Sequence, residues 1–118
     1  MPNAKYKIKG NNKIPDYDSE LEIDVDDKYE AYSKAIPDQP TPIPGGTITW
    51  FNAFGVRAKS TGRDADITYK GTLKALPKGK RLFALYGGEP HEIPTEDAGK
   101  GRISFMLNVG DPPTGAGP

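Results

Sequence analysis

The sequence contains no cysteine and one histidine, His91. Without cysteine there are no disulfides, no thiolate metal ligands and no cysteine nucleophile, and one histidine leaves few routes to general acid–base catalysis. Long apolar runs are absent too: nothing approaches the roughly 20 residues of a membrane-spanning helix, and the N-terminus lacks the apolar region of a signal peptide. We therefore expect no membrane partner, and cytoplasmic synthesis or a place in a virion.

Large aliphatic side chains are also scarce, while glycine and proline are abundant. The 118 residues include 14 glycines and 12 prolines, a composition close to that of disordered chains. Disorder also requires a large net charge, however, and here 16 basic residues balance 16 acidic ones. The length is that of one domain. We expect one folded, loop-rich domain over residues 1–109 and a flexible tail over residues 110–118, where glycine and proline predominate.

Short catalytic motifs are missing. Gly99-Lys100 lacks the earlier glycine and the following Ser or Thr of a phosphate-binding loop, and no nucleophile elbow, zinc-protease motif or dinucleotide fingerprint occurs. The one cluster with metal-binding side-chain types consists of Glu89, His91 and Glu92, with Glu96 and Asp97 beyond them. A lone histidine in a proline-bearing loop is typically solvated, so we predict no metal site. The chain is expected to be neither an enzyme nor a cofactor carrier.

The charges cancel in total but are grouped along the chain. Residues 1–13 carry four lysines and no acid, residues 16–30 carry eight acids and one lysine, and residues 57–81 are again basic. The acidic block argues against nucleic-acid binding. One interpretation is that the first lysines pair with the acids across a hairpin. The other is a docking surface for a protein partner, and a second copy of this chain is one candidate for that partner. The residues assigned to that surface are Asp18, Glu20, Glu22, Asp24, Lys70 and Lys74.

Alternating apolar and polar residues predict several short strands separated by Gly/Pro turns. We expect an all-β sandwich of about six to seven strands, with a small OB-like barrel as the alternative. A capping-box-like Asp27 and Glu30 with helical spacing of tyrosines predicts one short helix over 28–35. Residues 87–101 are expected to form a long polar loop. The aromatic strand at 47–56 is expected in the core.

The segment from Tyr69 to Leu82 reads YKGTLKALPKGKRL. It resembles the strand–turn–strand pattern of immunoglobulin-like and fibronectin-type modules, in which a leucine-proline turn with glycine joins two core strands. The resemblance implies an immunoglobulin-like β-sandwich and brings no functional residues with it.

Two functions follow from these patterns. The first is a non-enzymatic structural or assembly module that acts through protein–protein contacts, as in a virion or surface assembly. The alternative is a carbohydrate- or small-ligand-binding β-sandwich, in which Trp50, Phe51 and His91 would contact the ligand.

Overall fold

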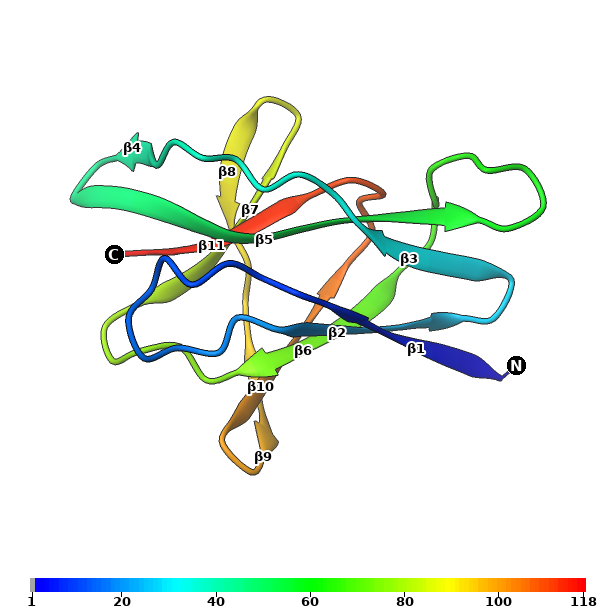
Figure 1. The fold of residues 1–118 in the computed structure, drawn as a ribbon, viewed down its shortest axis with the longest axis horizontal. Helices are drawn as coiled ribbons and strands as arrows, with labels where there is room; N and C mark the ends of the chain where they lie inside the picture. Colours follow the sequence, from blue (N-terminus) through cyan, green and yellow to red (C-terminus); the bar gives the residue numbers. More distant parts are fainter. Residues whose placement is uncertain (1) are drawn as a thin grey trace.

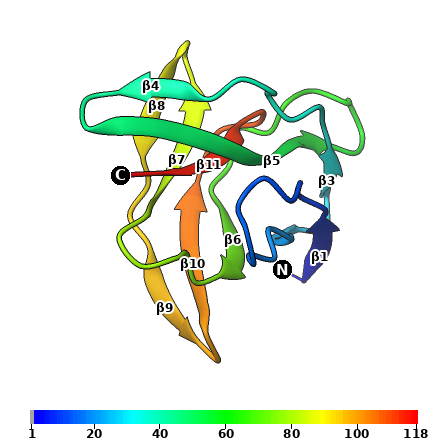
Figure 2. The same cartoon turned by 60° about the vertical axis from the view of Figure 1, so that its left-hand side comes forward.

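A computed structural model describes residues 2–118, which form two antiparallel β-sheets packed face to face (Figures 1 and 2). The first, called sheet I here, has the strand order β1 (Asn3–Ile8), β2 (Leu21–Asp26), β6 (Tyr69–Lys74), β10 (Arg102–Leu107) and β9 (Glu96–Gly99). The second, sheet II, has the order β3 (Tyr29–Ser33), β5 (Gly46–Ala58), β11 (Pro113–Gly117), β7 (Arg81–Tyr86) and β8 (Glu89–Glu92), with β4 (Thr41–Ile43) also paired to β5.

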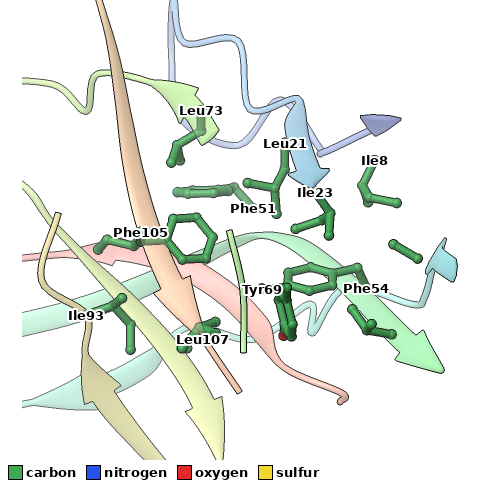
Figure 3. Close-up of a cluster of buried hydrophobic side chains, with 14 of the residues drawn as sticks. Ile8, Leu21, Ile23, Phe51, Phe54, Tyr69, Leu73, Ile93, Phe105 and Leu107 are labelled. Atoms are coloured by element: carbon green, nitrogen blue, oxygen red, sulfur yellow. The ribbon is translucent and has the colours of Figure 1, made fainter. Parts of the chain in front are cut away.

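The β-sandwich expected from the sequence is confirmed. The ladders of the described residues divide into two sheets, as in a sandwich and not in a closed OB-like barrel. Apolar side chains from both sheets meet between them, because alternate residues of each strand point to the same face (Figure 3). The leucine-proline turn near Pro77 joins β6 of sheet I to β7 of sheet II, so it connects two core strands.

The short helix expected over 28–35 is wrong, because this segment forms β3 and pairs with β5. Residue Asp26, not Asp27, organises the local turn, since its Oδ1 accepts a hydrogen bond from the Lys28 amide at 2.9 Å. Ala31 faces the core, whereas Glu30 and Tyr32 lie on the other face, which is the period of a strand. Tertiary pairing with β5 thus outweighs the weak helical spacing of the tyrosines.

The long loop expected over 87–101 is also wrong, because it contains β8 and β9. Gly87 and Gly88 have φ values of 62° and 78°, and they join β7 to β8 in a two-residue hairpin. Lys100 and Gly101, at 56° and 74°, join β9 to β10 in the same way. Positive φ at both central residues gives a turn whose twist matches that of the flanking strands. The structure therefore has more strands than the sequence predicts.

The flexible tail predicted at 110–118 is the third correction. Residues Pro113–Gly117 form β11, which lies in the middle of sheet II between β5 and β7. Gly115 is needed there: a Cβ at this position would lie 2.5 Å from the Thr49 carbonyl oxygen and 2.8 Å from the Trp50 ring. The glycines of this segment allow close packing of strands rather than mobility.

A β-bulge in β5 distributes its large side chains over two faces. Gly115 is opposite Trp50, and Thr114 is opposite Asn52, so Phe51 is the extra residue. Ile48 and Trp50 consequently lie in one hydrophobic cluster with Phe83, while Phe51, Phe54 and Val56 belong to the core between the sheets. A strict two-residue period would place Trp50 and Phe54 on the same face.

Candidate interaction surface

The outer face of sheet I is polar and open to solvent. In β1 and β6, the outward Lys5, Lys7, Lys70 and Lys74 are exposed, while the inward residues of β2 and β6 are buried. We call this surface the charged face. It is defined by the outward residues of four strands, namely Lys5, Lys7, Glu22, Asp24, Lys70, Thr72, Lys74, Arg102, Ser104 and Met106.

The acidic strand β2 lies between two strands that carry lysines. Asp24 is in register with Lys5 of β1 on one side and with Lys70 of β6 on the other. Lys5 Nζ also lies 3.9 Å from Glu22 Oε1, which is two residue pairs along the ladder and on the same face. The sequence prediction that the N-terminal lysines pair with the acidic strand is therefore confirmed. The charges on this face are arranged as neighbouring columns of opposite sign.

The six residues predicted as a docking surface are only partly brought together. Glu22, Asp24, Lys70 and Lys74 lie on the charged face. Asp18 and Glu20 precede β2, and Asp18 Oδ1 accepts a hydrogen bond from the Glu20 amide at 3.1 Å. Lys74 is opposite Arg102 rather than an acid. Their role in partner binding stays a prediction.

Sequence reasoning missed Met106, which is the one large hydrophobic side chain of the described residues that is strongly exposed, at 58%. It is opposite Lys70 in the ladder between β10 and β6. Beside it is an open hollow of about 360 Å³, lined by Lys70, Pro94, Glu96, Ser104, Phe105 and Met106. The available signal was its place in β10: an apolar residue stands at a position where the alternation calls for a polar one.

The outer face of sheet II carries a second apolar cluster, which the chain itself covers. Ile36 and Ile43, in the segment around β4, pack against the cluster of Ile48, Trp50 and Phe83. Figures 1 and 2 show this segment running alongside β5, on the side away from sheet I. The indole Nε1 of Trp50 donates a hydrogen bond to Thr41 Oγ1 at 2.9 Å, which ties the ring to β4.

This packing corrects the ligand-platform alternative at two of its three residues. Trp50 is 2% exposed and Phe51 is fully buried, so neither ring can stack on a sugar at the surface. Trp50 is held between β4 and the glycine-containing strand β11, and Phe51 lies between the two sheets against Tyr17, with ring centroids 5.7 Å apart. Both rings stabilise the fold.

His91, the third residue, is engaged within its own hairpin. Its ring stacks on that of Tyr86 with centroids 3.8 Å apart and planes 13° from parallel. His91 Nε2 also lies 3.1 Å from the Tyr86 carbonyl oxygen. Within residues 2–118, no group of three or more His, Asp or Glu side chains is placed to hold a metal ion. The geometry gives His91 a role in joining β7 and β8.

Two buried tyrosines, Tyr17 and Tyr69, have structural roles. Burial raises the pKa of Tyr69 and of Tyr17 above the ordinary value. Both hydroxyl groups donate hydrogen bonds to backbone carbonyls, Tyr69 to Val109 and Tyr17 to Lys74.

Two exposed ion pairs connect segments that are distant in the sequence, Lys13 to Asp38 at 2.7 Å and Lys34 to Asp111 at 2.6 Å. Lys13 lowers the pKa of Asp38 by hydrogen bonding to its carboxylate.

Comparison with known proteins finds no matching family model, no matching curated protein and no matching solved structure. In the part of the chain that the structure describes, no helix could cross a membrane.

Proposed function

We propose that this protein is a non-enzymatic assembly module that acts through protein–protein contacts, and that sheet I provides its contact surface. The observation that carries the proposal is the difference in cover between the two outer faces. On sheet II, residues around β4 cover the outer cluster of Ile48, Trp50 and Phe83, whereas the charged face of sheet I has no such cover in residues 2–118.

Met106 supports this assignment. An exposed methionine has a flexible and polarisable side chain that adapts to irregular partner surfaces. Here it lies beside an open hollow and next to Lys70. A mixed surface of this kind, with a small apolar centre and a polar surround, has the general composition of a protein interface.

The charges on the same face favour selectivity over raw affinity. Because the acids of β2 already have lysines on both sides, a partner gains little from any single ion pair. Columns of alternating sign, however, penalise a partner that is placed out of register. The surface is therefore suited to fixing the orientation of a neighbouring protein.

The proposal is tested by measuring mass by light scattering after size exclusion, in dilute and concentrated protein and at low and high salt. We expect a mass above 12.8 kDa that rises with protein concentration. The same mass measurement compares two variants, Met106→Lys on sheet I and Leu85→Lys at the outer cluster of sheet II. The melting temperature of each variant is recorded first.

The ligand-binding alternative predicts a different result. If the protein is monomeric under every condition, and a sugar or ion raises its melting temperature, the assembly proposal is overturned in favour of a small-ligand-binding module.

A further inference from the structure

The two edges of sheet I carry charges of opposite sign. Strand β1 forms one edge and β9 forms the other, as the strand order shows. Edge strands expose backbone groups that can pair with another chain. The side chains along an edge therefore decide which strands can approach it.

The edge at β1 is basic. Its exposed side chains include Lys5 and Lys7, and the exposed Lys9 follows directly after the strand. The first acid in the sequence is Asp16. The acids nearest to this edge in the sheet, Glu22, Asp24 and Asp26, lie one strand further in.

The edge at β9 is acidic and fully exposed. Glu96 and Asp97 face solvent, and no lysine or arginine occurs between Leu82 and Gly99. Lys100 lies beyond the last paired residue, in the turn to β10. On the neighbouring hairpin, Glu92 is already paired to Arg81 at 2.6 Å.

This arrangement discriminates between the possible pairs of edges. Two β1 edges would bring lysines together, and two β9 edges would bring carboxylates together, and like charges across strands are destabilising. A β1 edge beside a β9 edge brings lysines to carboxylates. Charge alone thus disfavours both symmetric pairings and favours the mixed one.

We propose that the protein assembles with copies of itself head to tail, the β1 edge of one copy adding to the β9 edge of the next. The inference rests on the proposed function, since it names the partner of sheet I as a second copy. Such a contact joins two different surfaces, so a joined pair of copies still has one free β1 edge and one free β9 edge. Repetition of the contact produces an open chain or a closed ring, in which sheet I continues from copy to copy.

The test uses charge reversal at each edge. The β1-reversed variant is Lys7→Glu with Lys9→Glu, which leaves Lys5 beside Glu22. The β9-reversed variant is Glu96→Lys with Asp97→Lys. We expect each variant alone to remain at 12.8 kDa by light scattering, because both edges of each variant then have the same sign. An equimolar mixture restores association, since every acidic β1 edge meets a basic β9 edge and every basic β1 edge meets an acidic β9 edge.

The matched control is Lys78→Glu with Lys80→Glu, which reverses two exposed lysines in the turn between β6 and β7. It should associate as the unmodified protein does. Melting temperatures establish that every variant is folded before its mass is interpreted. The Asp97 carboxylate also accepts a hydrogen bond from the Gly99 amide at 2.9 Å, so Glu96→Lys alone is a second, milder test of the β9 edge.

The outcomes separate this inference from the function on which it rests. If the unmodified protein associates and neither reversal weakens that association, the edge contact is wrong while assembly through sheet I stands. If each reversal abolishes association but the mixture does not restore it, head-to-tail pairing is also wrong. If the unmodified protein never exceeds monomer mass, pairing between copies is overturned altogether.

Discussion

The outer faces of the two sheets differ in the side chains that they carry and in whether those side chains are covered. Sheet II places Trp50 and Phe83 outward and covers them with residues from around β4. Sheet I places lysines and carboxylates outward and leaves them in solvent, with Met106 as the exception. A chain poor in large aliphatic residues thus builds a second small core on one face only. The face that it leaves uncovered is the one available to a partner.

The comparison predicts very different costs for removing one large side chain from each face. Trp50→Ala should lower the free energy of unfolding by about 3–5 kcal/mol, because it empties the cluster under β4. Met106→Ala should change it by no more than about 0.5 kcal/mol, as is usual for an exposed position. Chemical denaturation of both variants gives the two values. Equal losses would contradict the assignment of the two faces.

The contact between the sheets can be weakened at a buried polar residue. The Asn52 side chain of β5 donates hydrogen bonds to the carbonyls of Ile8 at 3.1 Å and of Ser19 at 2.9 Å, which belong to the sheet I half of the molecule. Asn52→Ala leaves both carbonyls without this donor, so we expect a loss of about 1–3 kcal/mol in denaturation experiments. Thr68→Ala, at an exposed site, serves as the control. A loss no larger than that of the control would show that Asn52 does not link the sheets.

Stability at high pH should depend on the buried tyrosines. Burial raises the pKa of Tyr69, so the folded protein keeps this hydroxyl neutral while the unfolded chain ionises it. The corresponding stability is complete below the ordinary pKa of about 10 and is lost as the pH rises above it. Tyr69→Phe should lower stability by about 1 kcal/mol at neutral pH and reduce the alkaline decline. Melting curves recorded at increasing pH measure both effects, and an unchanged alkaline decline in Tyr69→Phe would contradict them.

The smallest effect is expected on the charged face. Asp24→Asn removes one acid from between Lys5 and Lys70 and should lower the free energy of unfolding by about 0.2–1 kcal/mol at low salt. The loss should shrink at high salt because these charges are partly exposed. Asp66→Asn, at an exposed position between strands, should have no such salt-dependent effect. Because Asp24 Oδ1 is buried without a hydrogen-bond partner, increased stability would mean that its desolvation outweighs its pairing with the lysines.

The sequence was most informative where alternation was regular. The pairing of the N-terminal lysines with β2 follows from the two-residue period and the turn between the segments, and the structure confirms it. Apolar and polar residues also alternate through much of β6 and β10. These strands have one solvent-exposed face and one buried face, so the alternation of polar and apolar residues shows which side chains point into the core.

Other features depend on contacts that a local pattern does not contain. The bulge at Phe51 changes which face each aromatic residue occupies, and it shows only when β11 is aligned with β5. The glycines of β11 signal flexibility in sequence, yet they are required because Trp50 lies against Gly115. Likewise, Met106 stands out only when the outer face of sheet I is seen as one surface. Each of these features depends on residues far apart in the chain.

The most direct test of the central claim is hydrogen–deuterium exchange of the backbone amides, compared between dilute and concentrated protein. If copies join through the edges of sheet I, the amides of β1 and β9 should exchange more slowly in concentrated protein, and those of the segment around β4 should not change. Slower exchange around β4 with none at the edges of sheet I would contradict the account. It would mean that copies meet through the face that the chain covers itself.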